Sequence, residues 1–161
     1  MKRNLKNINW KRFQNVIYYF NISDFNFPKP VLEVRVKEGR EPVDLRFCET
    51  ESWKKVLGVK TEAGFNEFII TLAEYPYMTM YVNNNYASLS YYWKENDPGY
   101  LSIGEENGLN DTEDMEFCMN SEYEKFLVSN YAVIPISQAK EAIVEFFKIE
   151  SLPTVVKWEE L

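Results

Sequence analysis

The clearest alternation of apolar and polar residues lies at the C-terminal end of the chain. An apolar run from Tyr131 to Ile136 ends at Ser137, whose hydroxyl is a good N-cap for a helix. The apolar residues that follow recur at three- and four-residue steps, which is typical of a helix with one buried face: Ala139, Ala142, Ile143, Phe146 and Phe147. Pro153 ends this pattern, and Thr154–Trp158 is predicted as a short strand. The tail therefore predicts a strand, a helix and a strand that pack on a sheet.

In the first third of the chain, apolar residues at helical spacing are followed by the alternating pattern of strands. Apolar residues at helical spacing predict a helix from Leu5 to Phe20. Val31–Lys37 and Val43–Phe47 alternate apolar and charged residues, as half-buried strands do. They are predicted to pair as a hairpin around a turn at Glu38–Pro42.

The next segment is harder to assign, because Phe65–Tyr75 fits both the helical and the strand pattern. The three- and four-residue steps between its apolar residues favour a helix that ends at Pro76. Before it, Ser52–Leu57 is predicted as a short helix ended by Gly58.

The middle of the chain reads as a series of strands. Met78–Val82 and Ala87–Trp93 are predicted to pair around Asn83–Asn85, because asparagine tolerates the left-handed backbone of a tight turn. After a turn at residues 94–99, Tyr100–Ile103 is predicted as a further strand.

Two more strands, Met115–Met119 and Lys125–Ile134, follow the polar, acidic loop Gly104–Asp114. The predicted fold class is α+β. It is a single domain, residues 1–161, with a central antiparallel sheet and helices near the N-terminus, near residue 70 and near residue 140.

Length and composition agree with one globular domain. The chain has 161 residues, 45% of them hydrophobic, and no low-complexity linker or internal repeat. Its two cysteines, Cys48 and Cys118, are expected to be buried free thiols, and whether they meet in space stays open. No secretory signal and no window of roughly 20 apolar residues is present, so we expect a cytoplasmic protein without a membrane partner.

The net charge of -7 hides an asymmetry along the chain. Residues 1–60 hold thirteen Lys and Arg against seven Asp and Glu, a net charge of +6, whereas residues 61–161 hold five against eighteen, a net charge of -13. The stretch Glu95–Glu124 contains ten acidic residues and no basic one. Such a field repels nucleic acid and attracts basic proteins, so a basic protein is the expected partner.

The residues that most enzymes use are missing. The chain contains no histidine, which removes the commonest general base and metal ligand. It has no glycine-rich phosphate loop and no serine elbow motif. The acidic run at residues 105–114 does not match the spacing of an EF-hand. We therefore expect no enzymatic activity, no cofactor, no metal and no small-molecule substrate, although catalysis by a pair of carboxylates remains formally open.

Aromatic residues accompany the acidic segment, and Tyr123 and Tyr131 follow the acidic loop Gly104–Asp114. Neighbouring residues of a strand face opposite sides, so one set of these rings belongs to the core and the other can be exposed. One interpretation is a core beside a solvated acidic loop. The other is a protein-binding surface with aromatic anchors and carboxylates that steer a basic partner. Its candidate contact residues are Tyr91, Tyr92, Trp93, Tyr100, Glu105, Glu106, Asp111, Glu113, Asp114 and Glu116.

The tail also matches the pattern Ile-Pro-x-x-x-Ala-x-x-Ala-x-x-x-Phe, then Pro, then Val-x-Trp. The matching residues are Ile134, Pro135, Ala139, Ala142, Phe146, Pro153, Val156 and Trp158. The chain thereby resembles the first-numbered family of bacterial immunity proteins, which are encoded beside polymorphic and contact-dependent toxins. The resemblance covers residues 65–161, while residues 1–60 form a variable part that matches no family.

The resemblance implies an immunity protein that neutralises a cognate toxin domain by binding it. Toxins that cut or deaminate nucleic acids need cationic clefts, so the acidic charge agrees independently with a nuclease or deaminase as the partner. Two alternatives remain: a cytosolic adaptor unrelated to toxins, and a carboxylate-dependent hydrolase. The identity of the toxin, the mode of inhibition and the oligomeric state stay open.

Overall fold

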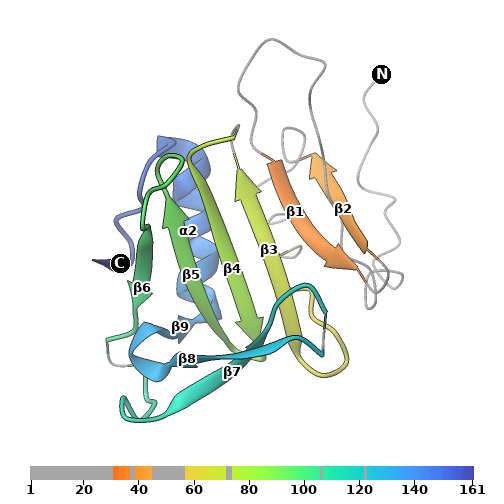
Figure 1. Cartoon of the computed structure of the whole chain (residues 1–161), viewed down its shortest axis with the longest axis vertical. Helices are drawn as coiled ribbons and strands as arrows, with labels where there is room; N and C mark the ends of the chain where they lie inside the picture. Colours follow the sequence, from red (N-terminus) through yellow and green to blue (C-terminus); the bar gives the residue numbers. More distant parts are fainter. Residues whose placement is uncertain (1–30, 37–38, 45–56, 72–73, 106, 122) are drawn as a thin grey trace.

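The computed structural model describes residues 31–36, 39–44, 57–71, 74–105, 107–121 and 123–161. The helix predicted at Leu5–Phe20, and that at Ser52–Leu57 except for Leu57 itself, lie outside these ranges. The described residues form an α+β domain with a large antiparallel sheet and one long helix (Figure 1). None of the helices in the described ranges has the length and apolar character that a membrane crossing requires.

The main sheet has eight strands, and all of its pairings are antiparallel. Its strands are β1 (Val31–Val36), β2 (Gly39–Asp44), β3 (Phe65–Thr71), β4 (Tyr77–Asn83), β5 (Tyr86–Tyr92), β6 (Tyr100–Ile103), β9 (Ile134–Pro135) and β10 (Lys157–Glu160). The order across the sheet is β10-β6-β5-β4-β3-β1-β2, and the short β9 pairs with β5. The predicted central antiparallel sheet is thus confirmed.

A separate hairpin consists of β7 (Asp114–Cys118) and β8 (Lys125–Ser129). The chain then passes through the 3-10 helix η4 (Asn130–Ala132) and β9 into α2 (Ile136–Ile149). The predicted strand Lys125–Ile134 is therefore wrong as one element. It is broken at η4, because the chain must leave the small hairpin there and join the main sheet beside β5.

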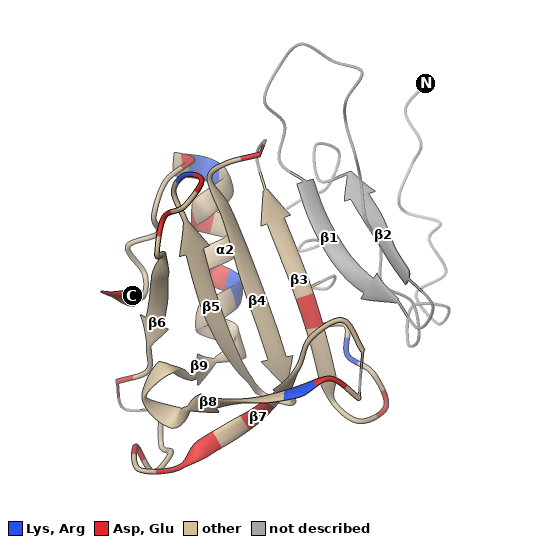
Figure 2. Cartoon of the chain, viewed as in Figure 1, with Lys and Arg blue, Asp and Glu red and all other residues tan. Residues whose placement is uncertain are grey.

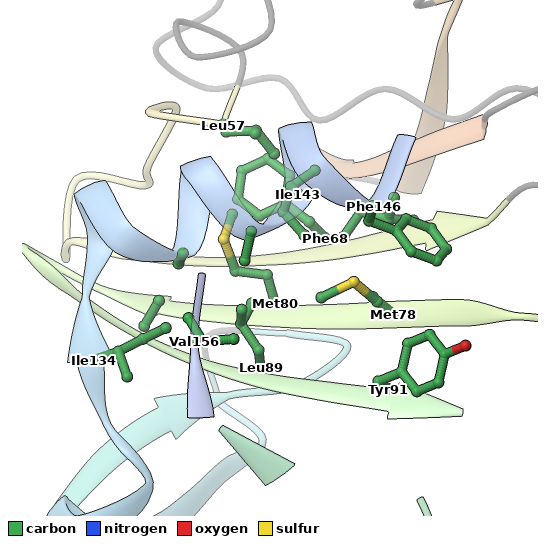
Figure 3. Packing of buried hydrophobic residues seen from close by; sticks show 14 of the residues in the cluster. Leu57, Phe68, Met78, Met80, Leu89, Tyr91, Ile134, Ile143, Phe146 and Val156 are labelled. Carbon is green, nitrogen blue, oxygen red and sulfur yellow. The ribbon is translucent and has the colours of Figure 1, made fainter. Parts of the chain in front are cut away.

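The apolar core lies between α2 and one face of the main sheet (Figure 3). Alternate residues of the central strands point at the helix, as the period of a strand requires. The fully buried members include Phe68 and Ile70 of β3, Met78, Met80 and Val82 of β4, Ala87 and Leu89 of β5, and Ala139, Ala142, Ile143 and Phe146 of α2. The predicted apolar face of the helix is confirmed, with Phe147 partly buried at its border.

The helix predicted near residue 70 is wrong, because residues 65–71 form β3, between β4 and β1. Phe68 and Ile70 face α2, and Glu67 is also buried although it lies on the other side of the strand. A strand buried on both faces loses the simple alternation of apolar and polar residues, so its sequence cannot be told from that of a helix. Pairing with two neighbours decided the outcome.

The helix α2 begins at Ile136, one residue before its predicted cap, so Ser137 as the N-cap is wrong. Pro135 occupies the cap position, and no side chain caps the helix. The backbone N–H of Ile136 donates instead to the carbonyl of Asn85, with 2.8 Å between nitrogen and oxygen. This tertiary bond satisfies one of the N–H groups that a cap residue would otherwise take.

The last strand also lies further along than predicted, at Lys157–Glu160. Residues 154 and 155 are held by the helix, because the carboxylate of Glu145 accepts hydrogen bonds from the N–H groups of Thr154 and Val155 and from the Thr154 hydroxyl. Burial by itself would raise the pKa of Glu145, but these hydrogen bonds outweigh it and lower the pKa.

The first hairpin is confirmed as a pair of strands, but its turn is shorter than Glu38–Pro42. Its second strand is Gly39–Asp44 instead of the predicted Val43–Phe47, of which residues 45–47 lie outside the described ranges. Gly39 already pairs with Val36, and Pro42 lies inside β2 opposite Glu33. Proline cannot donate to a ladder, and β2 tolerates it because this strand is at the edge of the sheet.

Tyr91 is the large polar exception in the core. Its side chain is 2% exposed and packs among aromatic rings, with Phe146 and Tyr100 both at 6.1 Å between ring centroids. Among the described residues its hydroxyl has no hydrogen-bond partner. Burial, followed by the charge of Asp97, raises the pKa of Tyr91 above its ordinary value of 10.0.

Tyr91→Phe tests this environment. Because a buried unpaired hydroxyl carries a desolvation cost, we expect the free energy of unfolding at pH 7 to stay the same or rise by about 1 kcal/mol. A pKa raised in the folded state means that the unfolded chain loses its proton first, so the wild type loses stability as the pH rises above about 10. The variant should lose less over that range. Urea unfolding at pH 7 and pH 10.5 measures both effects.

The matched control is Tyr123→Phe, which removes the hydroxyl of a 93% exposed ring. It should change neither the stability at pH 7 nor the loss at alkaline pH. A large loss of stability in Tyr91→Phe at pH 7 would mean that the hydroxyl has a stabilising partner.

Candidate functional site

The predicted aromatic anchors and the predicted acidic contacts lie at opposite ends of the main sheet. β5 starts at Tyr86, beside β9, and ends at Tyr92. Trp93 follows that far end, whereas β6 runs back so that the acidic loop starts at the near end. A seven-residue strand spans about 20 Å, so the two sets cannot form one compact patch. The single aromatic and acidic surface predicted from the sequence is therefore wrong.

The four predicted aromatic residues have three different environments. Tyr91 is in the core, and Tyr100 is partly buried against it, so neither is an exposed anchor. Tyr92 lies on the other face of the sheet and stacks on Tyr77 with ring centroids 4.7 Å apart. Trp93 alone among the four is exposed, at 54%.

The predicted acidic residues do gather, along β7 and the loops beside it (Figure 2). Asp111, Glu113 and Asp114 are exposed, and none of the described acidic residues between 95 and 124 is buried. Two of the predicted contacts are engaged within the chain: Glu105 forms an ion pair with Lys157, and Glu116 forms one with Lys125 at 2.7 Å. Both pairs are exposed and contribute little to stability. Glu106 lies outside the described residues.

Buried asparagines hold the acidic loop in place. The side-chain amide of Asn107 donates to the carbonyls of Asn130 and Val133, at 2.8 and 2.7 Å. The amide of Asn130 in turn donates to the carbonyl of Asn110 at 2.9 Å. Backbone groups that no strand pairs are thus satisfied by side chains, which gives the loop a defined path under its carboxylates.

The hairpin β7–β8 packs on the face of the main sheet that α2 leaves open. Its inner side is apolar: Phe126 meets the ring of Tyr81 edge-on at 4.8 Å, and Phe117 beside it is fully buried. Polar side chains of the sheet also reach its backbone. Asn83 donates to the carbonyl of Glu116, and Glu67 accepts from the N–H of Asn120. The hairpin is therefore fixed to the sheet from two adjacent strands, β3 and β4.

The outer side of the hairpin carries exposed apolar residues that the sequence analysis did not select. Leu127 is 65% exposed and pairs across the hairpin with Glu116, and Tyr123 in the turn is 93% exposed. Tyr131 at the other end is also exposed. A signal was present for Leu127, because Phe126 and Val128 are its apolar neighbours, and a strand that turns both toward the sheet must turn the residue between them outward. We name the acidic hairpin surface by its residues: Asp111, Glu113, Asp114, Glu116, Tyr123, Leu127 and Tyr131.

Within the described ranges, no group of three or more His, Cys, Asp or Glu side chains lies close enough to hold a metal ion. Cys118 is a buried thiol, and Cys48 lies outside the described residues. No protein-family model and no curated protein matches the chain.

Gly104 joins the acidic loop to the rest of the domain, and we expect Gly104→Ala to disrupt this junction. Its N–H donates to the carbonyl of Tyr131 at 2.7 Å, and a Cβ atom there would lie 1.7 Å from the carbonyl oxygen of Val133. Because that neighbour is backbone, the free energy of unfolding should fall by about 3 kcal/mol. Urea denaturation measures the loss.

Gly108→Ala is the matched control within the same loop. Gly108 has a φ of +78° and no atom within 4 Å of the added Cβ, so the cost is that of the left-handed backbone alone, about 1 kcal/mol. Equal losses in the two variants would contradict the close approach of Gly104 to Val133.

Proposed function

We propose that this chain is an immunity protein, which acts in the cytoplasm and neutralises a cognate bacterial toxin domain by binding it through the acidic hairpin surface. The observation that carries the proposal is the combination on that surface. Leu127 and Tyr123 are exposed large apolar side chains, and they lie among exposed carboxylates on a firmly anchored hairpin.

Each half of this combination has a separate role in binding a protein. When a partner covers exposed tyrosine and leucine side chains, their burial stabilises the complex, and tyrosine is common at interface hot spots. Exposed carboxylates such as Asp111 and Asp114 add little to affinity, but they speed the encounter with a basic partner and disfavour acidic ones. An acidic loop without exposed apolar side chains would provide only the electrostatic steering.

The charge of the surface favours a toxin that acts on nucleic acid, a nuclease or a deaminase. Such an enzyme binds phosphates with lysine and arginine, so its active-site cleft is cationic. Carboxylates on a rigid hairpin compete with the nucleic acid for that cleft by charge and by volume.

The resemblance to the immunity-protein family supports this proposal through residues of the core. The motif residues Ala139, Ala142, Phe146 and Val156 are buried, and the indole N–H of Trp158 donates to the carbonyl of Pro153 at 2.7 Å. These residues belong to the core on the face of the main sheet that α2 covers, whereas the hairpin packs on the opposite face. Specificity for one toxin would then lie in exposed residues outside the motif.

Reversing two exposed carboxylates of the acidic hairpin surface tests the electrostatic role. We expect Asp111→Lys with Asp114→Lys to slow association with the toxin domain of the neighbouring effector gene by about tenfold at low salt, because the steering field is lost. The difference should shrink as the ionic strength rises and screening shortens the range of the field. Stopped-flow association rates between 20 and 500 mM salt provide the measurement.

The control carries the same change in charge at the opposite end of the sheet. Glu74→Lys with Glu95→Lys reverses two exposed carboxylates there. It should slow association less than the hairpin variant. If the two double variants slow association equally, the total charge of the chain steers the partner and the acidic hairpin surface is not its contact site.

Truncating the apolar residues tests the contact itself. Tyr123→Ala with Leu127→Ala should weaken binding of the toxin domain at least tenfold, mainly through faster dissociation. The two side chains are exposed in the free protein, and the substitutions remove the apolar area that the partner would bury. Isothermal titration calorimetry measures the affinity.

Trp93→Ala is the discriminating comparison, since Trp93 is similarly exposed but lies at the other end of the sheet. It should change the affinity less than threefold. A larger effect at Trp93 than at Tyr123 and Leu127 would place the contact at the wrong end for this proposal.

A further inference from the structure

The hydrogen-bond register of the hairpin shows which backbone groups of β8 point away from β7. The N–H of Asn130 donates to Glu113, and the N–H of Met119 donates to Glu124, both over 2.9 Å. In an antiparallel ladder, bonded pairs alternate with pairs whose N–H and C=O groups point outward. The outward pairs are therefore Asp114 with Ser129, Glu116 with Leu127, and Cys118 with Lys125.

The two outer edges of the hairpin differ. On β7, the outward carbonyl of Glu116 is taken by the side chain of Asn83 at 2.8 Å, and that edge faces the main sheet. On β8, the outward groups belong to Lys125, Leu127 and Ser129, which are all exposed. Within the described part of the chain, no hydrogen bond is made to the backbone of Leu127, and β8 has no strand on this side. Among the residues that the structure describes, β8 is thus an open edge strand.

Folded proteins usually protect such an edge, because unpaired N–H and C=O groups invite another strand. A lysine on the edge is a common protection, but Lys125 is turned to β7, where it forms the ion pair with Glu116. Neither a proline nor a covering segment protects β8 within the described ranges. A two-stranded hairpin also gains stability when a third strand joins it.

We infer that the partner adds an edge strand of its own to β8 and extends the hairpin to a three-stranded sheet. This inference rests on the proposed function and names the mode of contact: main-chain pairing with Lys125, Leu127 and Ser129 gives affinity, and side chains give specificity. The occupant is a basic strand of the toxin domain.

Charge complementarity selects that occupant. An added strand lies about 5 Å from β8 and about 10 Å from β7, so long lysine or arginine side chains on it reach Asp114 and Glu116. A second copy of this chain fits poorly, because pairing β8 with β8 would bring two acidic hairpins together in a chain of net charge -7. Like charges at that spacing repel.

Ser129→Pro blocks the edge with little expected disturbance of the hairpin. Ser129 has a φ of -54°, which suits proline, and its N–H points away from β7. The proline removes one outward donor and places a ring where the incoming strand would lie. Ser129→Ala is the matched control: it deletes the hydroxyl that accepts from the Tyr131 N–H at 3.4 Å but keeps the outward N–H.

The experiment measures the affinity of the wild type and both variants for the purified C-terminal toxin domain encoded beside this chain. Circular dichroism and thermal unfolding check that the variants fold. We expect Ser129→Pro to weaken binding at least tenfold and Ser129→Ala less than threefold. If all three proteins bind equally, strand addition is overturned and the proposed function stands. If the wild type does not bind this domain at all, the proposed function fails with it.

Amide hydrogen exchange of the wild-type complex gives a readout that needs no variant. The N–H groups of Lys125, Leu127 and Ser129 should exchange quickly in the free protein and at least tenfold more slowly with the toxin domain bound. Protection confined to side-chain contact regions, with fast exchange retained at Leu127 and Ser129 in a saturated complex, would overturn strand addition. Sedimentation of the free chain as a dimer that Ser129→Pro dissociates would show that a second copy occupies the edge instead, and would overturn it too.

Discussion

The packing of α2 against one face of the main sheet is the interaction on which the rest of the molecule depends. Ala139 and Ala142 are small enough for the helix to approach the strands closely, and Phe146 fills the space beside Tyr91. Because this face is fully used, the hairpin β7–β8 can bury its own apolar side only on the opposite face. The proposed binding surface is therefore separated from the core by the thickness of the sheet, and its residues can change without altering α2.

Polar side chains connect the irregular part of the chain to this regular frame. Asn83, Asn107, Asn130 and Glu67 each bind main-chain groups that no strand ladder pairs. A buried backbone group without a partner costs free energy, so such bonds leave the acidic loop and the hairpin few alternative arrangements. Binding through the proposed surface would then require less ordering of the loop, which would preserve more of the interaction energy for affinity.

The sequence was a good guide where one period described a segment. The face of the helix formed by Ala139, Ile143 and Phe146, and the pairing of residues around Asn84, follow directly from spacing and turn chemistry. It was a poor guide at residues 65–71, where burial on both faces removes the alternation that marks a strand. The start of α2 and the start of the last strand also differ from the prediction. The carbonyl of Asn85 accepts from the first N–H of the helix, and Glu145 binds the N–H of Thr154, and neither contact is visible in the local sequence.

By itself, the sequence determined the α+β class, the central antiparallel sheet, the C-terminal helix and the concentration of acidic charge in one segment, because these depend on local periodicity and composition. Only the tertiary structure decided which side chains share a surface. It buried Tyr91, sent Trp93 to the far end of the sheet, and placed Leu127 beside the carboxylates instead. Strand direction and pairing set those positions, and pairing joins residues whose separation along the chain carries no signal of their distance in space.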